Sequence, residues 1–339
     1  MIHWQQYNDI ERMQLLDIAS AEKMLPRLAV EKDWWISVVL KAMTMSQYAG
    51  LYSFKGGTSL SKGWGLIERF SEDVDISIKR EDRFAIKGTS NSQLARARRT
   101  ARHYIIRELP DELSAHLTQM GICDFKVEPE TIRFRDDQEI ELRADTHPSV
   151  IFVYYKSVLP EASDYLLPRV KIEISCLSMN GLVEEKNIRS FISEVRPEAD
   201  DICVKIKTVI PTRTFLEKMF LLHEEFQKES PRSKRMSRHL YDLERIMDTP
   251  YGKDALSSDE LYKEIVKHRS IFNKIEGIDY SSHAPSSLNF IPPTHLIDEW
   301  KKDYEAMADQ FLYHQENRMT FETLIARMKE LLNKVRALG

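Results

Sequence analysis

A glycine turn followed by two alternating carboxylates constrains the fold of this 339-residue chain more than any other feature. The apolar run 51–54 leads into residues 55–62, which read Lys-Gly-Gly-Thr-Ser-Leu-Ser-Lys, and a second apolar run covers 74–78. This order predicts a strand, a turn, a helix that Thr58 or Ser59 can cap, and a second strand. The glycine turn and the carboxylates are about 16 residues apart, which suits a strand–helix–strand unit.

The carboxylates of Asp73 and Asp75 would share one face of the second strand, because successive side chains of a strand point to opposite faces. Val74 and Ile76 would then face the core. Two neighbouring carboxylates repel each other unless a cation neutralises them, and Mg²⁺ is usually bound through one or two carboxylates plus substrate phosphates. The sequence therefore predicts a site for Mg²⁺ (or Mn²⁺) at this strand.

The glycine turn is suited to a phosphate. Gly56 and Gly57 let a phosphate approach the backbone closely, and the helix start behind them offers unpaired N–H groups. Taken alone, Asp-x-Asp is more often a solvated strand edge, and Gly-Gly is more often a simple turn. Their joint occurrence in this order favours a phosphate and metal site.

The rest of the chain predicts an α+β protein with a mixed-sheet lobe over residues 1–210 and a helical lobe over 211–339. Helical periodicity precedes Gly50, and a long arginine-rich helical pattern covers 91–120. Alternating, β-branched runs predict further strands. These strands are expected at 123–127, 131–134, 150–155, 169–177, 187–192 and 202–209.

Composition excludes several classes of protein. Lys and Arg number 49 against 53 Asp and Glu, so the net charge of −4 argues against a uniformly basic surface. No apolar run approaches the roughly 18 residues of a membrane span, and no leader precedes the first helix. Cys123, Cys176 and Cys203 are isolated from one another. We therefore expect a cytoplasmic protein without disulfides or a membrane segment.

The two motifs together resemble the nucleotidyltransferase superfamily. Residues 55–60 with 69–75 (Arg-Phe-Ser-Glu-Asp-Val-Asp) are similar to the AbiEii-type abortive-infection toxins, and the resemblance extends over about residues 30–250. It implies a metal-dependent enzyme that transfers a nucleotide from an NTP to an acceptor hydroxyl, with tRNA as the acceptor for some members. It also implies a toxin of a two-gene toxin–antitoxin or phage-defence system, with a cognate antitoxin as its partner.

The resemblance implies a third carboxylate on a neighbouring strand, and Glu173 is the best local candidate. Residues 170, 172 and 174 alternate as a core face, which leaves Lys171 and Glu173 on the other face. Glu173 would bind metal or accept the proton of the attacking hydroxyl. The alternative is an exposed Lys171/Glu173 pair on an edge strand, and Glu141 and Asp145 are fallback candidates.

Two motifs of the helical lobe also resemble the family. Lys218 lies on an apolar helix face and would meet NTP phosphates, or alternatively extend along a helix edge to solvent. Arg238 and Asp242 match a closing Arg-x-x-x-Asp element, with a simple i,i+4 helix pair worth about 0.2–0.5 kcal/mol as the alternative. The implied catalytic residues are Asp73, Asp75, Glu173, Lys218 and Asp242. The implied nucleotide-binding residues are Gly56, Gly57, Thr58, Ser59, Arg69, Ser71, Lys218 and Arg238.

The arginine run at 96–107 is either a solvated helix face or a surface that follows RNA phosphates. Two other functions stay open at this point. The acceptor could be a protein or a small molecule, or the chain could be a non-catalytic binding module of a defence system.

Overall fold

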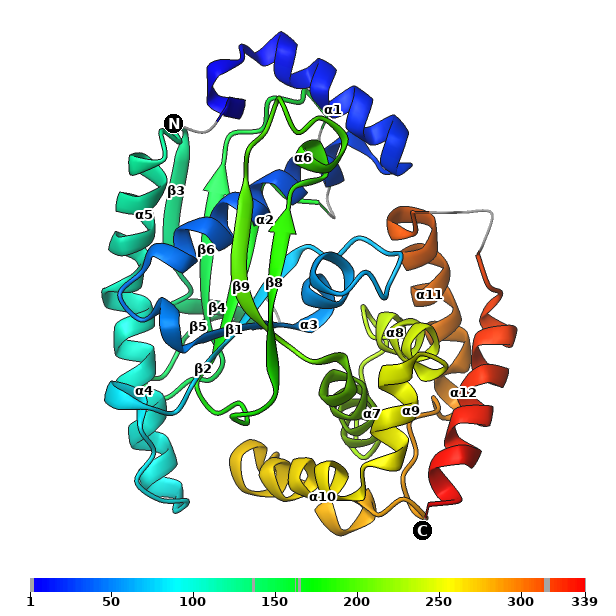
Figure 1. The fold of residues 1–339 in the computed structure, drawn as a ribbon. Coiled ribbons are helices and arrows are strands. Elements are labelled where there is room, and N and C mark those ends of the chain that lie inside the picture. The colour runs from blue at the N-terminus through cyan, green and yellow to red at the C-terminus, as the bar shows by residue number, and fades with distance from the viewer. Residues whose placement is uncertain (1–2, 136–137, 162, 164–165, 314–317, 339) are drawn as a thin grey trace. The chain divides into compact units, whose positions relative to one another are not determined.

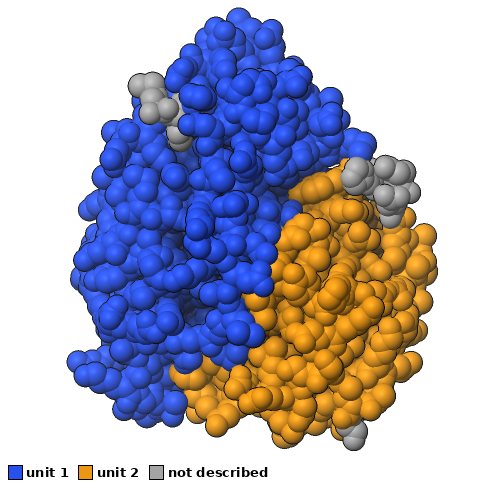
Figure 2. Space-filling view, viewed as in Figure 1, with its two compact units in different colours: residues 1–63, 70–208 blue, residues 64–69, 209–339 orange. Residues whose placement is uncertain are grey.

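The computed structural model describes residues 3–135, 138–161, 163, 166–313 and 318–338. The chain divides into two compact units, coloured separately in Figure 2. The first comprises Met1–Gly63 and Phe70–Thr208, and the second comprises Trp64–Arg69 and Val209–Gly339. A six-residue segment that precedes the two carboxylates therefore belongs to the second unit.

The first unit is built on a mixed sheet of seven strands, in the order β3-β6-β7-β2-β1-β9-β8. Strand β2 is parallel to β7 and antiparallel to β1, and β1 is parallel to β9. Strands β4 and β5 form a separate two-stranded sheet. The strands are β1 (Tyr52–Lys55), β2 (Asp73–Ile78), β3 (Phe125–Pro129), β4 (Ile132–Arg135), β5 (Gln138–Glu141), β6 (Ser149–Tyr155), β7 (Arg169–Ser175), β8 (Val183–Arg189) and β9 (Cys203–Val209). The predicted α+β class is confirmed.

Helix α2 lies across one face of this sheet (Figure 1) and is buried along most of its length. The ring of Trp35 stacks on Tyr155 of β6 with centroids 4.6 Å apart. The helices of the first unit are α1 (Asp9–Lys23), α2 (Arg27–Met45), α3 (Gly56–Thr58), α4 (Asn91–Arg107), α5 (Leu109–Gln119) and α6 (Phe191–Val195). Its shorter helical turns are η1 (His3–Gln6), η2 (Ala49–Leu51), η3 (Ser59–Gly63) and η4 (Asp82–Phe84).

Two expected elements differ in the structure. The helical pattern over 91–120 is two helices, because Pro110 has no N–H to donate and so favours a new helix start at α5. The strand expected at 187–192 ends at Arg189. There the Ser190 hydroxyl accepts a hydrogen bond from Ser193 N at 2.9 Å and caps α6.

The second unit is helical, as expected for this part of the chain. Its helices are α7 (Pro211–Phe226), α8 (Ser237–Met247), α9 (Pro250–Ser257), α10 (Asp259–His268), α11 (Ile297–Phe311) and α12 (Phe321–Arg336). Its shorter turns are η5 (Arg269–Asn273), η6 (Tyr280–His283) and η7 (Thr294–Leu296). The indole of Trp64 donates to Val209 O at 3.0 Å, and Tyr313 N donates to Glu68 O at 3.0 Å. These bonds hold the inserted segment in the unit.

No helix within the described ranges is long and apolar enough to cross a membrane.

We expect Ile151→Ala to lower the free energy of unfolding by about 2–5 kcal/mol, because the side chain is fully buried on β6 and its loss leaves a cavity. Ile10→Ala is the matched control, since Ile10 is 65% exposed and its truncation should change stability by less than about 0.5 kcal/mol. Urea denaturation of both variants measures the difference. Equal stabilities would contradict the packing described here.

Candidate active site

The predicted carboxylates form one row on two neighbouring strands of the first unit, β2 and β7, and a lysine of β1 adjoins them. Asp75 on β2 is opposite Lys55 on β1 and opposite Glu173 on β7. Asp73 is opposite Lys171. Because paired residues of a sheet project to the same face, these five side chains share one face. The other face of the same strands is apolar, and its residues Val74, Ile76, Val170, Ile172 and Ile174 are at most 1% exposed.

The pairing contradicts one part of the alternative interpretation of strand β7, although the Lys171–Glu173 pair of that interpretation is formed. Strand β7 lies between β6 and β2, so it is an interior strand and not the edge strand of the alternative interpretation. Glu173 nevertheless remains accessible on its face, with 35% of its side chain exposed. Glu141 lies on β5 of the separate sheet, and Asp145 is held by Arg143 at 3.1 Å. Neither belongs to the carboxylate row.

Two lysines, Lys55 and Lys171, lie among the three carboxylates of this face. The Lys171 ammonium donates to Glu173 Oε2 at 2.9 Å. Burial alone would raise the pKa of Glu173, but Lys171, Lys55 and His147 lower it below its ordinary value. Burial likewise acts to lower the pKa of Lys171, which Glu173 and Asp73 raise on balance. Both groups are therefore ionised at neutral pH.

The glycine turn packs directly against the carboxylate row. Gly56 has φ +78°, a conformation that favours glycine, and a Cβ at this position would lie 2.0 Å from Asp75 Oδ2. The turn and the Asp75 carboxylate therefore occupy adjoining space that only glycine leaves open. A phosphate bound at the turn would lie beside a carboxylate able to share a cation with it.

The hydroxyls next to the glycines support the turn from inside. Ser59 Oγ donates to Gly56 O at 2.9 Å, and Thr58 Oγ1 donates to Ser71 Oγ at 3.0 Å. Thr58 and Ser59 are at most 1% exposed. The helix expected here is a three-residue α3 that continues as the π-helical turn η3. Its dipole is correspondingly small, so phosphate binding would depend on the backbone N–H groups.

The anchor of this motif was not predicted from the sequence. Lys62 at its end donates to Asp33 Oδ1 of α2 at 2.5 Å, and Phe191 N donates to Asp33 Oδ2 at 2.7 Å. Burial raises the pKa of Asp33 to about 6, and Lys62 limits the rise. The signal was a run of three charged residues, Glu31, Lys32 and Asp33, inside an otherwise apolar helical stretch. All three are at most 3% exposed.

The second unit holds the remaining predicted residues around a fully buried carboxylate. Arg69 Nε donates to Asp242 Oδ1 at 2.7 Å and Arg69 Nη2 to Oδ2 at 2.8 Å. Lys218 Nζ lies 2.8 Å from Asp242 Oδ2 and 3.2 Å from His239 Nδ1. Burial acts to raise the pKa of Asp242, but Arg69 and Lys218 hold it far below its usual range. Burial lowers the pKa of Lys218, and it lowers the pKa of His239 well below its ordinary value. His239 is therefore neutral and accepts a hydrogen bond from the Lys218 ammonium.

The i,i+4 pair between Arg238 and Asp242 is not formed. Both carboxylate oxygens are bound by Arg69 and Lys218, and Arg238 has no ion-pair partner in the part of the chain that the structure describes. The predicted residues therefore form two groups, one in each unit. The first unit holds Gly56, Gly57, Thr58, Ser59, Ser71, Asp73, Asp75 and Glu173. The second unit holds Arg69, Lys218, Arg238 and Asp242.

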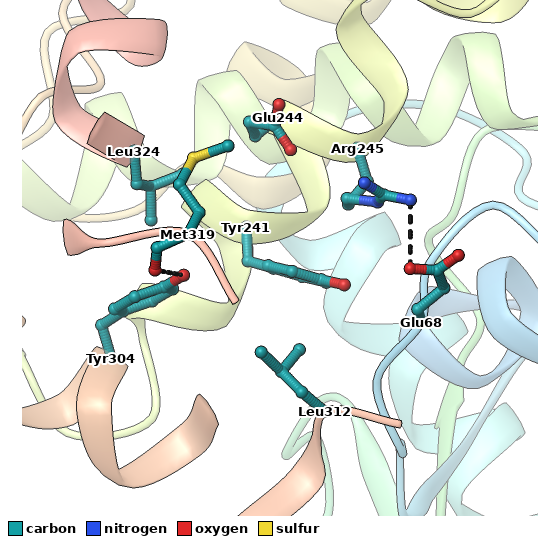
Figure 3. Close-up of a pocket in the computed structure, with 8 residues that line it drawn as sticks. All are labelled: Glu68, Tyr241, Glu244, Arg245, Tyr304, Leu312, Met319 and Leu324. Atoms are coloured by element: carbon teal, nitrogen blue, oxygen red, sulfur yellow. Dashed lines mark hydrogen bonds and ion pairs between the residues drawn. The ribbon is translucent and has the colours of Figure 1, made fainter. Parts of the chain in front are cut away.

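A small cavity in the second unit lies beside helix α8, which carries the buried Asp242 (Figure 3). Its volume of about 30 Å³ suits a single water molecule and not a nucleotide. Arg245 Nη2 lies 3.2 Å from Glu68 Oε2 at one side, and the Tyr304 hydroxyl donates to Met319 O at 2.8 Å at another. The cavity is lined by Glu68, Tyr241, Glu244, Arg245, Tyr304, Leu312, Met319 and Leu324.

A metal site would have to be completed by substrate. Within the described residues, no three His, Cys, Asp or Glu side chains are grouped closely enough to hold a metal ion by themselves. Mg²⁺ is commonly bound by one or two carboxylates plus waters and substrate phosphates, and it prefers oxygen ligands. Asp73 and Asp75, next to a turn open to phosphate, fit that coordination.

Comparison with known proteins identifies the family of this chain. Residues 38–327 match the family model described as "Nucleotidyl transferase AbiEii toxin, Type IV TA system". The chain belongs to the AbiEii nucleotidyltransferase toxin family. The predicted family is therefore confirmed. The matched region extends well past residue 250, into the last helices of the chain. This membership also makes the protein an enzyme, a nucleotidyltransferase of a type IV toxin–antitoxin system, and not a non-catalytic binding module.

A solved structure shares the fold of this AbiEii protein. It is MenT4, the nucleotidyltransferase toxin Rv2826c from Mycobacterium tuberculosis H37Rv, with a TM-score of 0.55 and 13% sequence identity. The similarity covers 96% of this chain and 90% of that one. No match was found among curated proteins.

We expect Gly56→Ala to reduce nucleotide transfer by roughly 100-fold or more, because its Cβ would displace the Asp75 carboxylate and a misplaced catalytic group has effects of that order. Gly50→Ala is the matched control, since a Cβ there meets nothing within 4 Å. Transfer rates of both variants measure the effect. Full activity of Gly56→Ala would show that the turn and the carboxylate do not work as one site.

We expect Asp242→Asn to lower the free energy of unfolding at pH 7 by about 3–5 kcal/mol, because it leaves Arg69 and Lys218 buried without a counter-charge. The lowered native pKa of Asp242 stabilises the fold above the unfolded-state pKa of about 3.9, and that contribution is lost as the pH falls towards the native value. The difference between wild type and variant should therefore shrink below about pH 4.

Urea denaturation at pH 7 and at lower pH tests this expectation, with Asp298→Asn as the exposed control in the same unit. A difference that stays constant with pH would mean that the charge of Asp242 contributes nothing to stability.

Proposed function

We propose that this AbiEii protein transfers a nucleotide from an NTP to a hydroxyl of tRNA in a reaction that requires Mg²⁺ or Mn²⁺, and that a cognate antitoxin restrains it in the cytoplasm. The observation that carries the proposal is the row formed by Lys55, Asp75 and Glu173, with Gly56 against Asp75. A phosphate turn, a carboxylate pair and a third carboxylate in register are the groups that this chemistry needs.

Asp73 and Asp75 are the proposed metal ligands, with Glu173 as a third. A bound Mg²⁺ would neutralise the charge of the triphosphate and stabilise the negative charge that develops in the transition state. The backbone of Gly56 and Gly57 would bind phosphate oxygens. Lys55 lies opposite Asp75 and adds a cation beside them.

Glu173 is also the proposed proton acceptor, because it is ionised at neutral pH and partly exposed. The acceptor oxygen would attack the α-phosphorus, the bond to the β-phosphate oxygen would break, and pyrophosphate would leave with the electron pair. The hydroxyl proton would pass to a Glu173 carboxylate oxygen. The Lys171 ammonium donates to Glu173 Oε2 and so fixes the orientation of the Glu173 carboxylate.

Thr58, Ser59 and Ser71 are proposed to shape the nucleotide site through the turn, since their hydroxyls bond within it. In the second unit, Lys218 and Arg238 are the proposed phosphate-binding cations. Arg69 and Asp242 are positioning residues in this proposal, because Asp242 binds the Arg69 guanidinium with both oxygens and also holds the Lys218 ammonium.

RNA is favoured as the acceptor by the exposed side of helix α4. Arg96, Arg99, His103 and Arg107 are all exposed and recur at helical spacing, so they form one continuous basic stripe. Such a stripe suits the regularly spaced charges of a nucleic-acid backbone, which a small-molecule acceptor lacks.

We expect the purified protein, incubated with Mg²⁺, total tRNA and each α-³²P-labelled NTP in turn, to label RNA on a denaturing gel. Asp73→Asn and Asp75→Asn should abolish the label and leave the melting temperature within roughly a few degrees, because both side chains face away from the core. Asp201→Asn, at an exposed aspartate, is the matched control. Chelation by EDTA should stop transfer, and added Mg²⁺ or Mn²⁺ should restore it.

The outcomes separate the parts of the proposal. Label on a protein or a small molecule would contradict tRNA as the acceptor and keep the chemistry. Transfer that survives EDTA would contradict the metal, and full activity of both aspartate variants would overturn the assigned site.

A further inference from the structure

Helix α4 carries a second set of arginines that do not belong to its exposed stripe. Arg98 and Arg102 are four residues apart, so they lie on the same side of the helix, one turn from each other. Arg102 is only 2% exposed, and Arg98 is half-buried. Two guanidinium groups are therefore turned into the first unit.

Several donors of these two groups are buried without an acceptor. Arg102 Nη2 donates to Glu130 O at 3.0 Å, but Arg102 Nε and Nη1 have no hydrogen-bond partner in the described structure. Arg98 Nε is likewise buried and unpartnered there. Buried donors of charged groups are rarely left unsatisfied, because desolvating them is unfavourable. Three such atoms on side chains one helical turn apart therefore lack an acceptor within the described residues.

The nearby carboxylates do not fill this role. Glu130 is held by Arg133 at 2.6 Å, and Asp145 is held by Arg143 at 3.1 Å. Burial lowers the pKa of Arg102, Glu130 offsets this in part, and Arg133 lowers it further. A guanidinium nevertheless remains protonated in proteins. Arg98 acts on Asp145 electrostatically and helps to lower its pKa, but no carboxylate of the described residues is hydrogen-bonded to Arg98 or Arg102.

These two arginines lie near the carboxylate row. Arg98 and Lys55 both act on His147, whose pKa is lowered to about 4, chiefly by burial. His147 Nε2 accepts from Cys176 N at 3.2 Å and lies 3.0 Å from Ser175 Oγ. Ser175 is two residues beyond Glu173 on the same face of β7. A ligand held by the arginines would therefore be close to the end of the strand that carries Glu173.

We propose that Arg98 and Arg102 form a binding site for a phosphate group. A phosphate offers several acceptor oxygens around a compact negative charge, and guanidinium forks bind such oxyanions with paired hydrogen bonds. The inference rests on the proposed function for the source of that phosphate, which is either a backbone phosphate of the acceptor RNA or a phosphate of the nucleotide. The binding chemistry is the same for both sources.

The site itself is tested without any transfer reaction. We expect inorganic phosphate, exchanged for chloride at constant ionic strength, to raise the melting temperature of the full chain. At ten times its dissociation constant the rise should be roughly 3 °C for a ligand that binds only the folded state. Arg98→Gln and Arg102→Gln should lose a large part of this rise. Arg189→Gln, at an exposed arginine of the same unit, should keep it and corrects for general effects of phosphate on stability.

A structural role alone would lower the melting temperature of Arg102→Gln equally at every phosphate concentration. That result, or a rise in both variants equal to that of Arg189→Gln, would overturn the proposal. Arg98→Gln keeps the test valid if Arg102→Gln does not fold, because no hydrogen bond or ion pair of Arg98 is present in the described structure.

Steady-state kinetics then identify the source of the phosphate. A rise of about tenfold or more in KM for tRNA, with KM for the NTP unchanged, assigns the site to the acceptor. The reverse pattern assigns it to the nucleotide. Unchanged values of both in Arg98→Gln would contradict a role in the reaction. Loss of the phosphate-induced rise in a protein that labels no RNA would support the site and refute the proposed acceptor.

Discussion

The two-sided character of strand β2 is the constraint on which the candidate active site depends. Val74 and Ile76 are fully buried, and because the side-chain period of a strand is two, their burial fixes Asp73 and Asp75 on the opposite face. A slip of one residue would bury both carboxylates and expose the apolar pair. The hydrophobic core of the first unit therefore specifies where the carboxylates are, with no contribution from substrate or metal.

The neighbouring strands turn this pair into a site. Strands β1 and β7 flank β2 on both sides, so Lys55 and Glu173 come into register with Asp75 through backbone pairing alone. Gly56 follows Lys55 directly and leaves the space that the Asp75 carboxylate occupies. The ion pair of Lys62 with Asp33 then fixes the end of the same motif to helix α2, at a position where both side chains are at most 3% exposed. A site held by strands and a buried ion pair loses little entropy when it orders a substrate.

Local parts of this arrangement could be predicted from the sequence, and distant partners could not. The glycine turn, the faces of β2 and the alternation around Glu173 all follow from periods of two or from neighbouring residues. The bond between Arg69 and Asp242 joins residues 173 positions apart. Periodicity along one helix offered Arg238 as an alternative partner of Asp242, because a helix pattern reveals only neighbours within the same helix, such as i,i+4. The anchor at Asp33 was hidden for the same reason, although charged residues inside an apolar helix were its visible sign.

The buried cluster of Asp242, Arg69 and Lys218 illustrates what a charged residue provides that an apolar residue at the same position would not. Burying ion pairs contributes little net stability, since desolvation offsets most of the attraction. What the cluster does provide is a fixed geometry: two oxygens of one carboxylate orient Arg69 in a bidentate pair and still hold the Lys218 ammonium at 2.8 Å. The Asp242 carboxylate therefore positions an arginine and a lysine of the second unit at the same time, which an apolar residue of equal volume could not do.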